Sequence, residues 1–182
     1  MTETVEHVEG ALSTRTYRQT MSRFPKSCTV ITTAGADGPV GCTATSVFSL
    51  SLRPPSLVVS LGSTSTTLVN VLSSGRFMVN MLSSSQYELS TRFATGDPSR
   101  RLDGVPHTWW GDVPVLADTS ASLACDLVQV VSAYDHTLVV GAVQWTRTDE
   151  HTPLVLLDGQ AHVARPRLAA WRDTIEESGD QV

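Results

Sequence analysis

Two short clusters of small hydroxyl side chains are the residues of this sequence best suited to hold a ligand. The stretch 41–68 carries many Ser and Thr residues but only one charged residue, Arg53. If Ser65, Thr66 and Thr67 open a helix, the free backbone N–H groups of its first turn form an anion site, and the hydroxyls add donors. A phosphate would fit there. The alternative is that these residues only cap the helix.

The other cluster is TATS at 43–46, where a strand is expected to end. Small side chains let a ligand approach the backbone closely, so N–H and C=O groups there could contact the polar edge of a flat heterocycle. The alternative is a crowded strand end without a ligand. The cluster at 43–46 could contact a polar ring edge and the cluster at 65–67 a phosphate. Together they suit one nucleotide-like ligand that spans both clusters.

A turn with two ionisable residues, AYDH at 133–136, precedes an apolar strand. His136 beside Asp135 could contact a ligand, or it could be a histidine that only stabilises the turn. Trp109 and Trp110 could cover a ring, although aromatic residues buried to anchor a loop are the simpler interpretation.

Several motifs of nucleotide-binding and nucleophilic enzymes are missing. The sequence has no GxGxxG after a strand, no GxxxxGK[ST] and no GxSxG. Its cysteines, Cys28, Cys42 and Cys125, show no CxxC spacing, and the five histidines show no metal-ligand spacing with them. We therefore expect reduced thiols and no metal. If the protein is an enzyme, a bound cofactor must supply the difficult chemistry, and no catalytic side chain is expected.

The composition indicates a single domain with a packed core. The chain has 182 residues, 41% of them hydrophobic, and a formal net charge of −5 without a block of Lys or Arg. Nucleic-acid and membrane-surface partners would require a concentrated basic face, so we expect neither. The start is neither a signal nor a transit peptide, which with the thiols predicts a cytoplasmic protein. The expected organisation is a flexible N-terminus at 1–14, a domain at 15–167, and a C-terminal helix and tail at 168–182.

Apolar periodicity and turn residues predict short strands with a few helices between them. The expected strands are 29–33, 40–48, 56–61, 76–82, 122–131, 137–146 and a strand or hairpin at 153–163. The expected helices are 15–23, a short helix that begins near 65 and stops at Gly75, a helix that a capping box of Ser85 and Glu88 opens, and 168–177. Pro54 and Pro55 are expected to interrupt strand pairing, and 97–114 to form an irregular loop that serves as a lid or an interface.

The short connections between these strands predict the fold class. They suit an antiparallel sheet that closes on itself, which gives a mainly β protein: a β-barrel with peripheral helices. A doubly wound parallel sheet would need helices of about ten or more residues between nearly every strand pair, and they are missing.

The ordered set of motifs FPKSCTVITT, GCTATSVFSLSLRPPSLVVSL, STSTTL, RFMVNML, TRF, DGVP and YDHTLVVGAV resembles the flavin reductase family, whose members bind flavin in a split β-barrel. The resemblance covers about 24–157. These small proteins feed reduced flavin to two-component monooxygenases. The resemblance implies an antiparallel split barrel, a homodimer with the flavin near the subunit interface, and a flavin-dependent monooxygenase as partner.

The resemblance also implies the ligands and their contacts. FAD or FMN would bind, with FAD slightly favoured, and NADH or NADPH would donate hydride. Residues 43–46 would face the isoalloxazine ring and 65–67 would hold the phosphate. The flavin-binding residues implied are Lys26, Ser27, Cys28, Thr43, Ala44, Thr45, Ser46, Ser60, Ser65, Thr66, Thr67, Asn80 and Phe93. Asp135 and His136 match the family's Gly-Asp-His motif, which implies nicotinamide binding by this pair and Gly141.

Some positions depart from the family pattern. Thr66 stands where many relatives carry Arg or Lys, so the phosphate would be held with less charge. Tyr134 replaces the Gly of Gly-Asp-His. Leu156 and Ala161 lie where relatives often have tyrosines, so those C-terminal contacts do not carry over.

The function that the resemblance implies is reduction of FAD or FMN by hydride from NADH or NADPH, followed by release of reduced flavin to a monooxygenase. Two alternatives remain open. One is a split-barrel oxidase of the pyridoxamine phosphate oxidase type, which keeps its flavin. The other is a non-catalytic module that binds flavin or haem.

Overall fold

The computed structural model describes residues 12–164. Within them no helix is both long and apolar enough to cross a membrane. The helix expected at 168–177 and most of the flexible N-terminus expected at 1–14 lie outside the described residues, whereas the first helix, α1 (Thr14–Ser22), lies inside them.

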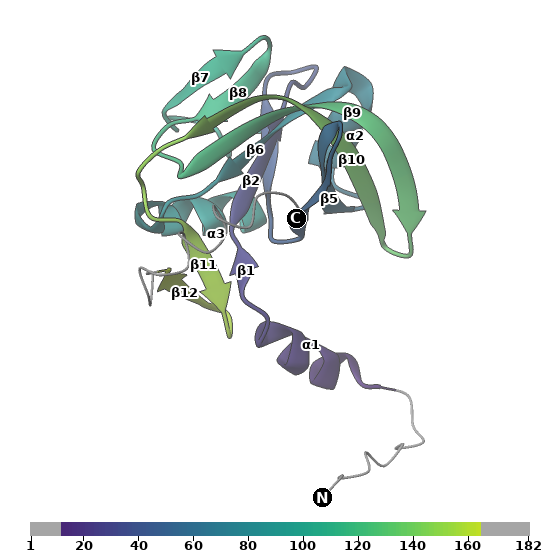
Figure 1. Ribbon diagram of the computed structural model, residues 1–182, viewed down its shortest axis with the longest axis vertical. Coiled ribbons are helices and arrows are strands. Elements are labelled where there is room, and N and C mark those ends of the chain that lie inside the picture. The colour runs from purple at the N-terminus through teal and green to yellow at the C-terminus, as the bar shows by residue number, and fades with distance from the viewer. Residues whose placement is uncertain (1–11, 165–182) are drawn as a thin grey trace, which may run out of the picture.

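A seven-stranded sheet forms the body of the molecule and curves around its core (Figure 1). Its strands lie in the order β3-β2-β6-β9-β10-β5-β4, and every pairing is antiparallel. The strands are β2 (Thr29–Thr33), β3 (Val40–Ala44), β4 (Val47–Leu52), β5 (Pro55–Gly62), β6 (Arg76–Met81), β9 (Ala121–Ala133) and β10 (His136–Thr148). The expected antiparallel barrel with peripheral helices is confirmed.

Two helices, α2 (Thr66–Ser74) and α3 (Tyr87–Thr95), cover opposite faces of the β2–β3 edge of this sheet, since α2 packs with Ile31 and α3 packs with Val30. Their ends follow from local sequence. Helix α2 packs on β2 and β3 and stops at Gly75, whose φ of 70° is a left-handed conformation that glycine adopts without a steric cost. Helix α3 packs on β3 and follows the 3-10 turn η1 (Ser84–Gln86).

Two small sheets flank the body. Strand β1 (Lys26–Ser27) pairs with β11 (Leu154–Leu157), which pairs with β12 (Gln160–Val163), so the hairpin expected at 153–163 is confirmed. This small sheet lies beside helix α1, away from the main sheet (Figure 1). The second small sheet is a hairpin of β7 (His107–Trp110) and β8 (Val113–Leu116).

The buried core contains a polar hub at Asn80. Its amide nitrogen donates to the carbonyl of Val30 and the hydroxyl of Thr32, both at 3.1 Å. Its oxygen accepts from the Leu116 N–H at 3.0 Å and from Ser122 Oγ at 3.5 Å. The hub therefore ties β6 to β2, β8 and β9 inside the buried core.

The structure corrects four local expectations. The segment 97–114 is not an irregular loop throughout, because it contains β7 and the start of β8. The capping box joins Ser83 and Gln86 at η1 and not Ser85 and Glu88, because the first turn is a 3-10 turn. The strand expected at 40–48 breaks between β3 and β4. Pro54 lies in the tight turn between β4 and β5, so the prolines end a hairpin and do not interrupt pairing.

Gly141 on β10 has no room for a side chain. A Cβ there would lie 2.5 Å from Cζ of Phe77 and 2.8 Å from Cβ of Cys125. We expect Gly141→Ala to lower the free energy of unfolding by about 1–3 kcal/mol, because the core must shift to admit the methyl group. Urea unfolding measures this. Gly62→Ala is the matched control, since nothing lies within 4 Å of its added Cβ, and equal losses in both variants would contradict the prediction.

Candidate functional site

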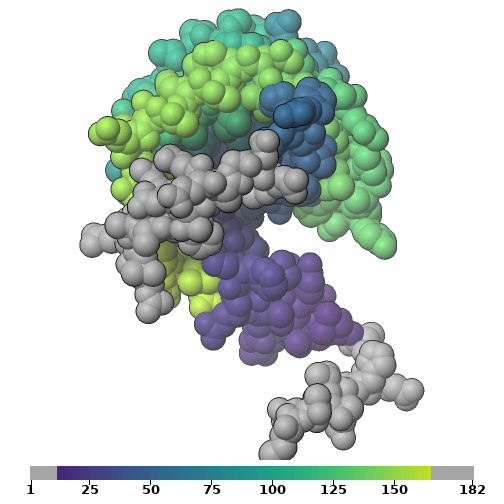
Figure 2. Space-filling view, in the orientation of Figure 1, coloured from purple at the N-terminus to yellow at the C-terminus, as the bar shows by residue number. Residues whose placement is uncertain are grey.

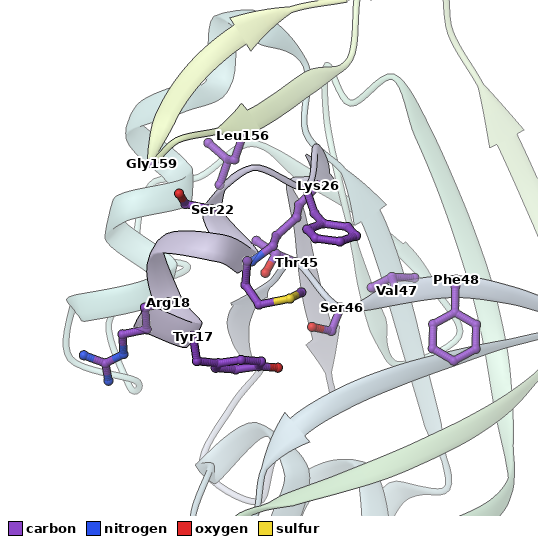
Figure 3. Close-up of a pocket in the computed structure, with 12 residues that line it drawn as sticks. Tyr17, Arg18, Ser22, Lys26, Thr45, Ser46, Val47, Phe48, Leu156 and Gly159 are labelled. Carbon is purple, nitrogen blue, oxygen red and sulfur yellow. The ribbon is translucent and has the colours of Figure 1, made fainter. Parts of the chain in front are cut away.

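A cavity of about 710 Å³ lies between helix α1, β1 and the break between β3 and β4 (Figure 3). The space-filling view shows the surface indented beside α1, which is drawn in purple (Figure 2). The volume is typical of a cofactor or small-molecule site. The lining residues are Tyr17, Arg18, Met21, Ser22, Phe24, Lys26, Thr45, Ser46, Val47, Phe48, Leu156 and Gly159.

Thr45 and Ser46 reach this cavity because the chain leaves the sheet between β3 and β4. The hydroxyl of Thr29 donates to the Ala44 carbonyl at 2.6 Å, and the Ser60 N–H donates to the Ser46 carbonyl at 3.0 Å. These bonds fix both sides of the break. No described residue accepts a hydrogen bond from the N–H of Thr45 or Ser46, so these donors are free for a ligand.

Helix α1 forms the opposite wall. Tyr17 and Met21, one helical turn apart, both line the cavity, and Tyr17 points across it toward Ser46 (Figure 3). The end of the helix is fastened to the β11–β12 turn through Asp158. This residue pairs with Arg23 Nη1 at 2.7 Å, accepts from Ser22 Oγ at 3.1 Å, and donates its N–H to the Ser22 carbonyl at 2.8 Å.

The start of helix α2 has side-chain hydroxyls that are unused within the described residues, although the Ser65 N–H donates to the Gly62 carbonyl at 2.9 Å. Ser65 is the N-cap residue, but its side chain makes no capping hydrogen bond within the described chain. Capping alone therefore does not explain this hydroxyl. Thr66 is exposed, whereas Thr67 is buried. The Thr67 hydroxyl has no hydrogen-bond partner among residues 12–164. It lies close to Cys42, where burial raises the pKa of the thiol and the Thr67 hydroxyl partly offsets that rise.

The residues predicted to bind flavin fall into two groups. Lys26, Thr45 and Ser46 line the cavity, and Ser27 lines a second, more apolar cavity of about 390 Å³. Cys28, Ala44, Asn80 and Phe93 are buried in the core, and Thr43 donates its hydroxyl to the Ser90 carbonyl at 2.6 Å. These five side chains have structural roles in this chain, and contacts from them to flavin stay a prediction, as do contacts from Ser60 and from 65–67.

The predicted nicotinamide residues lie on the β9–β10 hairpin. His136 Nδ1 lies 2.9 Å from Asp135 Oδ1, and this hydrogen bond holds the pKa of the Asp135 carboxyl below its usual range. Tyr134 beside them is fully exposed with a φ of 56°, a conformation that glycine tolerates better. Gly141 is not beside them, because it lies five residues along β10 against Phe77. Its role in nicotinamide binding stays a prediction.

The three thiols are poor nucleophiles. Burial raises the pKa of Cys28 and of Cys42, and burial together with the nearby Asp126 raises the pKa of Cys125 to about 12. None of them forms a disulfide, and within 12–164 no group of His, Cys, Asp and Glu could hold a metal ion. Because a thiol attacks only as the thiolate, covalent catalysis by cysteine finds no support here.

The donor set of the cavity fits a flavin. Phe24, Val47, Phe48 and Leu156 give apolar surface for a flat ring. The free N–H groups of Thr45 and Ser46 can contact the polar pyrimidine edge of that ring. A cavity with apolar walls and a few convergent polar groups is the usual form of a cofactor site.

Comparison with known proteins identifies the family. Residues 21–165 match the family model described as Flavin reductase like domain. Similarity extends over 162 residues, at 32% identity, to an NADH-dependent flavin reductase of Rhodococcus sp, with 87% of this chain and 91% of that protein covered. HsaB of Mycobacterium tuberculosis, named as the reductase subunit of a flavin-dependent monooxygenase, is 31% identical over 177 residues, with 93% and 94% covered.

A solved structure agrees with these matches. The flavin reductase PheA2 in its native state superposes with a TM-score of 0.78 at 34% identity, with 85% of this chain and 100% of that chain covered. The chain belongs to the flavin reductase-like family. The resemblance inferred from the motifs is confirmed, and with it the split-barrel fold class.

Sequence reasoning missed the cavity wall that helix α1 provides. Tyr17, Met21 and Phe24 line the cavity, but the only prediction for 15–23 was a helix, without a role in the site. The spacing of Tyr17 and Met21 was a usable signal, since residues four apart lie on one face of a helix. Phe48 and Leu156 carried no comparable signal.

The unpartnered Thr67 hydroxyl gives a stability test. We expect Thr67→Val to leave the free energy of unfolding unchanged or to raise it, because valine has nearly the same shape and removes a buried hydroxyl without a partner. Thr29→Val is the matched control, and we expect it to cost roughly 1–3 kcal/mol because the Ala44 carbonyl loses its donor. Urea unfolding compares the two. A larger loss in Thr67→Val than in Thr29→Val would contradict the assignment.

Proposed function

We propose that this protein is an NAD(P)H-dependent flavin reductase that reduces FAD or FMN and supplies the reduced flavin to a partner monooxygenase. The observation that carries the proposal is the cavity between α1 and the β3–β4 break, with its free backbone donors, in a chain of the flavin reductase-like family. Relatives named as an NADH-dependent flavin reductase and as a monooxygenase reductase subunit support it.

In the proposed reaction, hydride passes from C4 of the nicotinamide to N5 of the flavin. Such transfer requires the two rings to stack at roughly 3–3.5 Å, so the protein contributes position above all. The N–H groups of Thr45 and Ser46 stabilise the negative charge that develops on the N1–C2=O side of the ring. No side-chain base is needed for the hydride step.

The flavin is proposed to act as a diffusible substrate. The segment 62–75, which includes the start of α2, contains no charged residue. Its hydroxyl and N–H groups would hold the phosphate without an ion pair, which favours moderate affinity. Moderate affinity suits a protein that must release reduced flavin to a separate oxygenase in the cytoplasm.

A homodimer is part of the proposal. Edge strand β4 exposes Phe48, Leu50 and Leu52, which are 52–66% exposed, beside the second cavity. On β9, Val128 is 64% exposed. Large apolar side chains gathered on an edge strand are typical of a surface that a partner covers. Because Phe48 lines both cavities, a second subunit on β4 would also border the flavin site.

Anaerobic mixing of the protein with FAD or FMN and NADH tests the activity. We expect the visible absorption of oxidised flavin to bleach at a rate that depends on the protein concentration, because hydride reaches N5. NADPH and buffer without protein provide the comparisons. Flavin binding without bleaching by either nicotinamide would favour a non-catalytic binding module and contradict the proposal.

His136 tests the predicted nicotinamide site. We expect His136→Ala to raise the KM for NADH by about two- to tenfold, the effect of one lost hydrogen bond, and to change the KM for flavin less. Steady-state kinetics with each substrate varied in turn measures this. His151→Ala is the control, since His151 is exposed and lies after β10, away from this hairpin turn. A larger rise in the flavin KM would mean that the turn contacts flavin.

A further inference from the structure

The cavity carries positive charge that no lining residue balances. Arg18 and Lys26 are the charged residues that line it, and no lining residue is a carboxylate. Neither forms an ion pair with another residue of the described 12–164. In a chain with a net charge of −5, this cavity is a locally positive site.

The two cations are placed differently. Lys26 is half-buried on β1, and its side chain reaches into the cavity between helix α1 and Thr45 (Figure 3). Arg18 is exposed and points away from the cavity (Figure 3). Strand β1 is held by its pairing with β11, where Lys26 is opposite Leu156. The ammonium group of Lys26 is therefore the cation that a ligand in this cavity would meet.

We propose that the ammonium group of Lys26 lies near the flavin ring and stabilises the anionic reduced flavin more than the oxidised flavin. This inference rests on the proposed function. When the nicotinamide C4–H bond breaks and the flavin N5–H bond forms, the ring gains two electrons and one proton, and the resulting negative charge lies on its N1–C2=O side. A fixed cation beside Thr45 and Ser46 favours that charged product over the neutral oxidised ring.

The competing role for Lys26 is to hold a flavin phosphate. Two observations argue against it. The first turn of α2, where the phosphate is predicted to lie, contributes no lining residue to this cavity. Lys26 instead lies with Thr45 and Ser46, the predicted contacts of the ring. The cation therefore lines the cavity beside the predicted ring contacts, whereas the predicted phosphate site is not part of that lining.

The two roles differ in thermodynamics. A cation that contacts the phosphate acts equally on oxidised and reduced flavin, since the phosphate does not change on reduction. A cation near the ring acts mainly on the reduced form, and only such a differential interaction shifts the balance between the two states. The ratio of the two dissociation constants thus separates the roles, independently of turnover.

The experiment compares Lys26→Met with Lys26→Arg, and with Arg15→Met as a control that removes one positive charge from α1 outside the cavity. Dissociation constants of oxidised and of dithionite-reduced flavin are measured anaerobically, with riboflavin and with FMN. We expect Lys26→Met to weaken binding of the reduced form about tenfold more than that of the oxidised form. That change lowers the potential of the bound flavin by about 30 mV.

Three further results are expected. The effect of Lys26→Met is the same with riboflavin as with FMN, because the phosphate is not involved. Lys26→Arg keeps the wild-type ratio to within about threefold, since the charge is retained. Arg15→Met leaves the ratio unchanged. Circular dichroism confirms that each variant is folded, and Lys26→Gln replaces Lys26→Met if the latter is not.

Two outcomes would overturn the inference. One is an unchanged ratio of the two dissociation constants in Lys26→Met, whether both redox forms bind more weakly or neither does. The other is an effect seen with FMN but absent with riboflavin. A wild-type protein that binds neither flavin would instead refute the proposed function, so the two failures are distinguishable.

Discussion

The candidate site depends on the break between strands β3 and β4. These strands follow each other in sequence but lie at opposite edges of the curved sheet. If the chain ran straight from β3 into β4, Thr45 and Ser46 would be ordinary strand residues with their N–H groups in a ladder or facing solvent. The bonds from Thr29 to Ala44 and from Ser60 to Ser46 hold the break open on both sides. Backbone donors are thereby kept unpaired beside an apolar cavity, where a hydrogen bond is worth more than in water.

The many small hydroxyls of this chain serve two purposes, and the structure separates them. Thr29 and Thr43 use their side chains to satisfy backbone carbonyls inside the fold. Thr45 and Ser46 face the cavity instead. A hydroxyl is small enough for both tasks, which explains how a nearly uncharged stretch can supply both internal bonding and a ligand surface.

Sequence patterns predicted the architecture well because strand alternation and turn residues are local signals. Strand β2 and the stop of helix α2 at Gly75 were predicted at the correct residues. The β7–β8 hairpin was missed because Pro, Gly and Trp in 97–114 conceal a short pairing that tertiary contacts stabilise. The site was predicted only in part: Thr45, Ser46 and Lys26 line the cavity, whereas burial of Asn80 and Phe93 depends on which face of a strand or helix meets the core. The cavity wall formed by α1 depends on contacts with Asp158, which is far away in the sequence, so no local pattern reveals it.

The contacts between Asp158 and the end of helix α1 have a consequence for how a ligand enters and leaves the cavity. Helix α1 contributes no buried residue, and the ion pair between Arg23 and Asp158 joins side chains that are 77% and 39% exposed. Exposed pairs of this kind add little to stability, so swinging the helix aside leaves the barrel core intact. Access to the proposed flavin cavity can therefore depend on a few surface bonds at the end of helix α1, independently of the stability of the fold as a whole.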